Sequence, residues 1–231
     1  MNLTDQTLLR LLQLTDTAFP TGAFAHSFGL ETYVARGIVD TADRLESFIA
    51  NTLLHTVAPS DGVAAIAIAR ASADWGSLLQ LLDWRLTAMK TVSEFRQASQ
   101  MLGTRFLRTA TQVFALPRAS LYLEAIDAKQ LHGHLSLVYG LACHDLDLPL
   151  WPALAAWFRH YCASLVSVGV RLIPLGQTAG QMLLVQLGTT IVTAVERTLE
   201  QGIDDMTSFA PGQEIAGVIH RDMLTTRLYI S

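Results

Sequence analysis

The sequence has few charged residues, and lysine is the scarcest of them. Only 16% of the 231 residues are Asp, Glu, Lys or Arg, and Lys90 and Lys129 are the only lysines. Nucleic-acid-binding proteins need a basic surface, so a net charge of −4 argues against that class. Soluble domains carry about a quarter charged residues. With 51% hydrophobic residues, this chain is expected either to sit in a membrane or to cover apolar helical surface with a partner, which favours a homodimer.

Segments that would place the chain in a membrane or outside the cell are missing. The longest stretch without a charged residue, 172–195, is interrupted by Pro174, by glycines and by several Thr and Gln residues, which argues against a spanning helix. The first residues lack the basic and apolar regions of a signal peptide. Cys143 and Cys162 are the only cysteines, and their apolar surroundings predict buried thiols in a reducing compartment. We therefore expect a cytoplasmic protein with no membrane contact.

Motifs that support catalysis are also missing. The chain has no Gly-Lys-Ser or Gly-Lys-Thr run, so it lacks a phosphate-binding loop and is not expected to hydrolyse a nucleotide by itself. Gly-x-Ser-x-Gly and His-Glu-x-x-His runs do not occur either. Among the histidines, His132 and His134 would point to different sides of a helix, and His144 would lie about 15 Å further along it. Hydrogen-bonded histidines are favoured over a metal site, and neither a metal nor another cofactor is predicted.

Helical periodicity, in contrast, is nearly continuous. Apolar residues recur at helical spacing along the chain, and strand patterns are scarce. The pattern predicts a helix from about His26 to Arg36, a helix end at Pro59, and a break between Leu187 and Thr190. About ten helices with short connections, no repeat and no linker predict one all-α domain spanning residues 1–231.

The most distinctive stretch is Phe19 to Glu31, where a Pro-Thr-Gly turn leads into the start of a helix. Two interpretations are open. Its aromatic residues fill the core while His26 and Ser27 cap the helix, or the whole segment is a contact surface.

Two further stretches are unusual. Arg171 precedes an uncharged turn rich in Gly and Gln, and its guanidinium either fixes that turn or binds a partner. The chain end is apolar, with Leu228, Tyr229 and Ile230, whereas solvated termini are usually polar. An apolar terminus has to dock on its own core or on another protein.

Together these stretches resemble the signature of the F-type urease accessory proteins. The matching runs are Pro-Thr-Gly-Ala-Phe-Ala-His-Ser-Phe-Gly-Leu-Glu in 20–31, Arg-Leu-Ile-Pro-Leu-Gly-Gln-Thr-Ala-Gly-Gln in 171–181, and His220 with Thr-Arg-Leu-Tyr in 226–229. They follow the order of the family and span nearly the whole chain. Ala23 and Ser93 stand where Gly and Arg are frequent. Ile230 replaces a frequent basic residue, which favours apolar docking of the chain end.

The resemblance implies a helical, dimerising, non-enzymatic urease maturation factor. Such a factor bridges the D-type (also called H-type) accessory protein and the nickel-carrying G-type GTPase, and the complex acts on apo-urease to install nickel. The tail, residues 221–231, would become ordered on the D-type protein. We expect deletion of residues 227–231 to leave the thermal stability almost unchanged and to abolish complex formation. The residues expected to contact partners are Phe24, His26, Ser27, Phe28, Glu31, Arg171, Gln177, Gln181, Arg227, Leu228 and Tyr229.

The alternative is a helical small-ligand-binding protein or enzyme with a pocket between segments 19–31 and 171–181. A purely structural dimer without partners is a third interpretation, which the low charge content disfavours. Two experiments separate the maturation factor from the small-ligand-binding protein. Binding of the D-type and G-type proteins would support the first, and a ligand-induced thermal shift would support the second.

Overall fold

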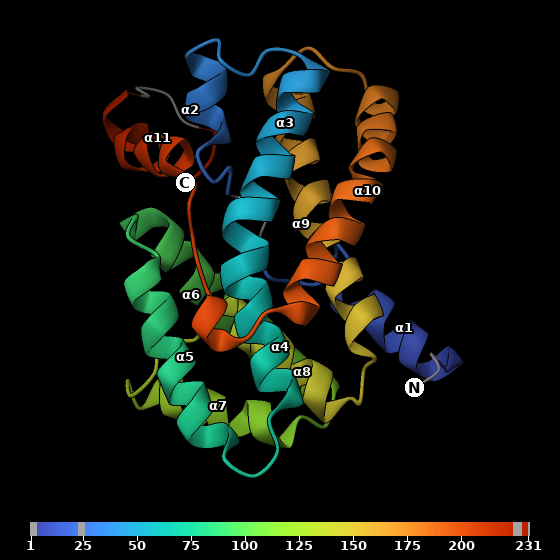
Figure 1. Ribbon diagram of the computed structural model, residues 1–231, viewed down its shortest axis with the longest axis vertical. Coiled ribbons are helices and arrows are strands. Elements are labelled where there is room, and N and C mark those ends of the chain that lie inside the picture. Colours follow the sequence, from blue (N-terminus) through green and yellow to red (C-terminus); the bar gives the residue numbers. More distant parts are fainter. Residues whose placement is uncertain (1–3, 23–25, 224–227, 231) are drawn as a thin grey trace.

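The computed structural model describes residues 4–22, 26–223 and 228–230, apart from the side chains of 221–223. These residues form helices and connecting turns without a strand, so the predicted all-α fold is confirmed (Figure 1). The helices are, in chain order, α1 (Asp5–Leu14), α2 (Leu30–Ala35), α3 (Ala42–Thr52), η2 (Leu53–Gly62), α4 (Val63–Arg70), α5 (Trp75–Met89), α6 (Ser93–Val113), α7 (Pro117–Asp127), α8 (Leu135–Asp145), α9 (Leu150–Leu172), α10 (Gln177–Glu200), η3 (Ile203–Asp205) and α11 (Pro211–Met223).

A long helical rod runs through the middle of the molecule, where α3, η2 and α4 follow one another without a break from Ala42 to Arg70 (Figure 1). The middle part, η2, is a π-helix of 10 residues, a form that is rare beyond a single turn. The prediction that Pro59 ends a helix is wrong, since Pro59 lies inside η2. The wider π turns accommodate a proline ring that would clash with the preceding turn of an α-helix.

Helix α10 is also longer than predicted, because it continues through Gly188 from Gln177 to Glu200. The predicted break between Leu187 and Thr190 is therefore wrong. A single glycine costs a helix only about 1 kcal/mol. Leu187 and Ile191, on either side of it, are buried, and each buried apolar side chain of that size contributes about 1.5–3 kcal/mol. Packing on the neighbouring helices outweighs the local preference.

Helix α8 lies in the core because a glycine lets it approach α4 closely. A Cβ on Gly140 would collide with the backbone oxygen of Ala65 and lie 2.5 Å from Cγ2 of Ile68. All residues from Ser136 to Cys143 are buried. The missing side chain at Gly140 thus sets how closely α8 packs against α4 in the central rod.

A fully buried carboxylate joins α5 to the segment that leads into α8. Asp83 accepts hydrogen bonds from the hydroxyl of Tyr122 at 2.5 Å, from the backbone N–H of His132 at 2.9 Å and from the N–H of Gly133 at 3.1 Å. Nδ1 of His132 lies 2.6 Å from the same carboxylate. The neighbouring His134 lies between the hydroxyls of Thr87 and Ser99. The prediction that these histidines are hydrogen-bonded is confirmed.

A second buried carboxylate, Asp61 in η2, forms an ion pair with Lys90 at 2.6 Å and accepts a hydrogen bond from the hydroxyl of Ser136 at 2.8 Å. Burial alone would raise the pKa of Asp61, but the ammonium of Lys90 and these hydrogen bonds outweigh it and lower that pKa. Asp61 therefore stays ionised and ties the central rod to α8 and to the loop after α5.

Two helical stretches are long and apolar enough to cross a membrane, judged by length and composition alone: Ala42–Arg70 and Gln177–Glu200. In the first, 72% of the most apolar window is buried inside the protein, as expected for the core helix of a soluble bundle. In the second only 33% is buried. The prediction that polar residues between 172 and 195 exclude a span is thus not confirmed by composition, and α10 exposes Met182, Val185 and Val192 among uncharged Gln and Thr side chains.

Acid is expected to destabilise the fold through His134. Its burial, with the ammonium of Lys90 nearby, lowers its pKa from 6.5 to about 4. In that interval the unfolded chain binds a proton that the folded chain does not, so stability falls as the pH drops and the loss approaches about 3 kcal/mol. We expect the free energy of unfolding, measured by urea titration between about pH 7 and about pH 4.5, to fall less steeply in His134→Gln than in wild type. Equal slopes would contradict this assignment.

Candidate partner-docking site

Residues 26–29 form a loop that leads into α2, which begins at Leu30. The predicted helix start at His26 is wrong, because Phe28 and Gly29 both adopt left-handed backbone angles, with φ of 49° and 87°. Gly29 is the N-cap residue of α2, and no side chain caps this helix end. His26 and Ser27 therefore do not have the capping role that one interpretation gave them. A left-handed conformation at a residue with a side chain costs about 1–2 kcal/mol, so other contacts must hold Phe28 in place.

Phe28 is held by its ring and by its carbonyl group. The ring centroid lies 5.9 Å from that of Phe95 in α6 and 6.4 Å from that of Tyr161 in α9. The carbonyl oxygen accepts a hydrogen bond from Nε2 of Gln213 in α11 at 3.0 Å. Phe28 thus connects α11 with the bundle, and its half-buried ring belongs mainly to the interior.

His26 and Ser27 are buried, with 2% and 0% of their surface exposed. Burial, reinforced by the charge of Arg105, lowers the pKa of His26 to about 4, so its ring is neutral near pH 7. The chain itself covers both residues. The predicted contact of His26 and Ser27 with a partner stays a prediction. Two further predicted contacts, Phe24 and Arg227, lie outside the described residues.

Glu31 is a buried carboxylate, 5% exposed, that binds the chain end. Its Oε1 accepts the backbone N–H of Leu228 at 2.8 Å, and its Oε2 accepts the backbone N–H of Tyr229 at 3.3 Å. Nε2 of His220, which is fully buried in α11, lies 3.7 Å from Oε2 of Glu31. One side chain in α2 therefore holds together α2, α11 and the tail.

The tail side chains divide between the interior and the surface. Tyr229 is 6% exposed and belongs to the core, whereas Leu228 and Ile230 are 69% and 58% exposed. The expectation that the whole apolar end docks on a partner is corrected for Tyr229, which packs on its own chain. The backbone bends at Leu228 and Tyr229, and the hydrogen bonds to Glu31 hold both N–H groups on the inner side.

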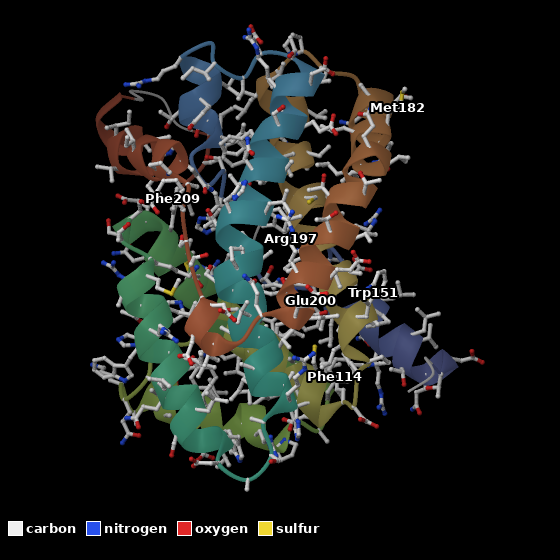
Figure 2. All side chains as sticks on the ribbon, viewed as in Figure 1. Phe114, Trp151, Met182, Arg197, Glu200 and Phe209 are labelled. Atoms are coloured by element: carbon white, nitrogen blue, oxygen red, sulfur yellow. The ribbon has the colours of Figure 1, made fainter. Side chains whose placement is uncertain are left out.

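More apolar side chains are exposed around α11. Ile215 and Val218, one turn apart on this helix, are 59% and 60% exposed. Phe209, just before the helix and labelled in Figure 2, is 75% exposed. With Leu228 and Ile230, Ile215 and Val218 define what we call the α11 surface, whereas Phe209 lines a pocket with residues of η2 and α10. The sequence pattern hides this surface, because an apolar side chain at helical spacing usually indicates core.

The segment 171–181 lies elsewhere. It covers the end of α9, the following turn and the start of α10, and Figure 1 shows α10 on the opposite side of α3 from α11. Arg171, Gln177 and Gln181 are all exposed. The guanidinium of Arg171 donates to the hydroxyl of Ser167 in its own helix at 3.3 Å. The contacts therefore do not show Arg171 fixing the turn, and the three exposed side chains remain predicted partner contacts.

The outer side of α10 continues from this segment as a second apolar area. Met182, Val185 and Val192 are 62%, 80% and 40% exposed, and Figure 2 shows Met182 on the outside of α10. No charged residue occurs between Gln177 and Val195. These three residues define what we call the α10 face.

A cavity of about 140 Å³ lies inside the bundle. Aromatic rings form much of its wall, including Phe28, Phe95 and Trp157, and the Asp61–Lys90 ion pair borders it. The alternative interpretation expected a pocket between segments 19–31 and 171–181. The described lining takes Thr21 and Phe28 from the first segment and no residue from the second. The cavity is therefore not in the expected place.

Metal ligands are not grouped in the described ranges: no three His, Cys, Asp or Glu side chains lie together in a way that could hold an ion. The buried polar side chains mainly form hydrogen bonds and ion pairs between helices. The exposed apolar side chains of the α11 surface and the α10 face are available for contact with other proteins. This combination is typical of a helical protein that binds other proteins.

Comparison with known proteins agrees with this class. The family model for UreF matches residues 39–188. The urease accessory protein UreF of Arthrobacter sp. (strain FB24) is 36% identical over 223 residues, covering 96% of each chain. The UreF proteins of Corynebacterium glutamicum (strain R) and Bacillus sp. (strain TB-90) are 35% identical over 221 residues and 31% identical over 225 residues, with at least 96% of each chain covered. The chain belongs to the UreF family of urease accessory proteins, which are non-enzymatic factors of urease maturation.

Tail substitutions should separate the buried from the exposed residues. Tyr229→Ala removes a ring that packs on the core and is expected to lower the free energy of unfolding by about 2–4 kcal/mol. Leu228→Ala, at a mostly exposed position, should change it by less than about 0.5 kcal/mol. Thermal and urea denaturation of the two variants measures the difference. Equal stabilities would show that the tail does not pack on the chain as described.

Proposed function

We propose that the chain bridges partner proteins during urease maturation in the cytoplasm, with the D-type accessory protein on its α11 surface. The observation that carries this proposal is the divided tail: Glu31 and Tyr229 attach it to the chain, while Leu228 and Ile230 face outward. Exposed apolar side chains on an attached segment favour docking of a second protein, because burying each contributes about 1.5–3 kcal/mol.

The G-type GTPase is the second proposed partner. Because the sequence has no phosphate-binding loop, nucleotide hydrolysis belongs to that partner, and this chain would hold it in register with the D-type protein and apo-urease. Arg171, Gln177 and Gln181, all exposed at the α9–α10 turn, are the proposed contacts. Their polar ends and distance from the α11 surface suit a separate, polar interface.

A second copy of the chain is the proposed occupant of the α10 face. An uncharged helix face can pair with its own copy about a two-fold axis without bringing like charges together. Burying Met182, Val185 and Val192 would also remove the exposed apolar side of a helix that is only 33% buried in its most apolar window.

Copurification tests the D-type contact. A full-length double variant, Leu228→Asp with Ile230→Asp, places charges on the outward side of the tail. It should retain the thermal stability of wild type and lose at least about tenfold in affinity for the D-type protein, since buried unpaired charges are costly. Leu121→Asp, a similar change at an exposed leucine of α7, serves as the control and should bind normally. Normal binding by the double variant would refute the proposed contact.

Light scattering tests the homodimer. Wild type should have the mass of a dimer at micromolar concentration, and Val185→Asp should have that of a monomer, because the substitution puts a carboxylate near its own copy in the interface. Leu81→Asp, at an exposed leucine of α5, should stay dimeric. A wild-type monomer would rule out the dimer, and a dimeric Val185→Asp would place it on another surface.

Small-ligand binding is a second candidate function, supported by the internal cavity. Its volume of about 140 Å³ is close to that of an engineered apolar cavity that binds benzene, about 150 Å³. A thermal shift produced by small aromatic compounds in the purified protein, and abolished by filling the cavity in Ser99→Phe, would support this function.

A further inference from the structure

The internal cavity has a mainly apolar wall. Aromatic rings from the 26–29 loop, α6, α8 and α9 form much of it: Phe28, Phe95, Phe106, Tyr139, Trp157 and Tyr161. Aromatic rings attract one another in offset and edge-to-face arrangements, beyond the gain from burying their area. The wall therefore favours a ligand whose body is a flat apolar ring.

An ion pair forms the main polar part of the wall. Nζ of Lys90 donates to Oδ2 of Asp61 at 2.6 Å, and Oδ1 of Asp61 accepts a hydrogen bond from the hydroxyl of Ser136 at 2.8 Å. Asp61 stays ionised, because Lys90 and these hydrogen bonds lower its pKa. The pair has no net charge. An ammonium group has three N–H donors, so Lys90 can also donate to an oxygen atom of a ligand while it holds Asp61.

We propose that the cavity binds a small neutral aromatic molecule with one hydroxyl or carbonyl oxygen. The ring lies among the aromatic side chains, and the oxygen accepts a hydrogen bond from Nζ of Lys90. This proposal rests on the second candidate function, small-ligand binding, and adds the chemical class of the ligand. The cavity volume of about 140 Å³ suits a single ring with one small substituent, since a cavity of about 150 Å³ holds benzene.

The ion pair also selects against charged ligands. A carboxylate in the cavity would add a second negative charge beside Asp61, and an ammonium group would add a second positive charge beside Lys90. In both cases a buried charge would be left without a partner of its own, which is costly. A ring without any oxygen would cover Lys90 and offer its ammonium no acceptor. A neutral ring with one oxygen avoids these costs.

The cavity reaches the surface beside the turn that follows α1. Asp16 in this turn lines the cavity and is exposed. The carbonyl oxygen of Thr15, in the same turn, lies 3.0 Å from Nδ1 of His160 in α9, and both residues line the cavity. A small ligand can therefore enter between this turn and α9 while the core of the bundle stays folded.

Four matched compounds test the ligand class by NMR titration of the full-length protein at neutral pH: phenol, toluene, benzoate and benzylamine. Each has one ring, and only benzoate and benzylamine are charged. Phenol should bind at least as tightly as toluene, and the two ions should bind at least about tenfold more weakly than phenol. The indole N–H signal of Trp157 should report binding in the cavity. The signals of Trp84 and Trp151, which are exposed and outside the described lining, should not move.

A double variant, Asp61→Asn with Lys90→Met, tests the role of the ion pair. It removes both charges and leaves the aromatic wall in place. The ratio of phenol affinity to toluene affinity should fall at least about tenfold, because the hydrogen bond from the ammonium is lost. Toluene should still bind as in wild type, which checks that the cavity is intact. The matched control, Asp127→Asn with Arg108→Met, changes an exposed ion pair outside the described lining and should leave the ratio unchanged.

The outcomes separate the ligand class from the candidate function. If none of the four compounds shifts the Trp157 signal, small-ligand binding and the ligand class are refuted together. Tighter binding of toluene than of phenol, or binding of either ion as tight as that of phenol, would refute the class alone. If the double variant does not fold, the four wild-type dissociation constants still decide the class. An unchanged ratio in a folded double variant would overturn the contact with Lys90.

Discussion

Buried carboxylates need donors, and in this chain the donors come from distant parts of the sequence. Asp61 brings Lys90 and Ser136 to the central rod. Asp83 gathers Tyr122, His132 and Gly133. Glu31 does the same with the last residues of the chain. Because an unpaired buried charge is far costlier than a lost surface contact, these three groups limit the helical packings that are compatible with the sequence. The exposed apolar surfaces depend on that packing for their positions.

The helices themselves could be predicted from the apolar periodicity, but several of their ends could not. Pro59 and Gly188 are strong local signals for a break, and both lie inside continuous helices. At Pro59 the wider π turns accommodate the ring, and at Gly188 burial of the flanking residues outweighs the local preference. That burial depends on helices far away in the sequence. The predicted start of α2 was wrong because contacts with α11 and α9 hold Phe28 at a left-handed backbone angle. No local sequence pattern reveals such contacts.

The candidate site was visible in the sequence as a set of unusual stretches, without their roles. The polar residues His26 and Ser27 proved to be buried, whereas Leu228, Ile230, Ile215 and Val218 are exposed. From residue type alone, one would expect the polar pair to be exposed and these apolar residues to be buried. No local pattern indicates the division at 228–230, because a bend and the hydrogen bonds to Glu31 determine it. Family membership establishes a role in urease maturation, and the proposed surfaces assign that role to parts of the molecule.

The central claim is that the α11 surface receives the D-type protein while the α10 face is already covered by a second copy. Side-chain footprinting with hydroxyl radicals, applied to the full chain with and without the D-type protein, tests it most directly. The account predicts that Ile215, Leu228 and Ile230 lose reactivity when the D-type protein binds, and that Met182 is protected both before and after. Protection of Met182 only on addition of the D-type protein, with Leu228 unchanged, would contradict the account.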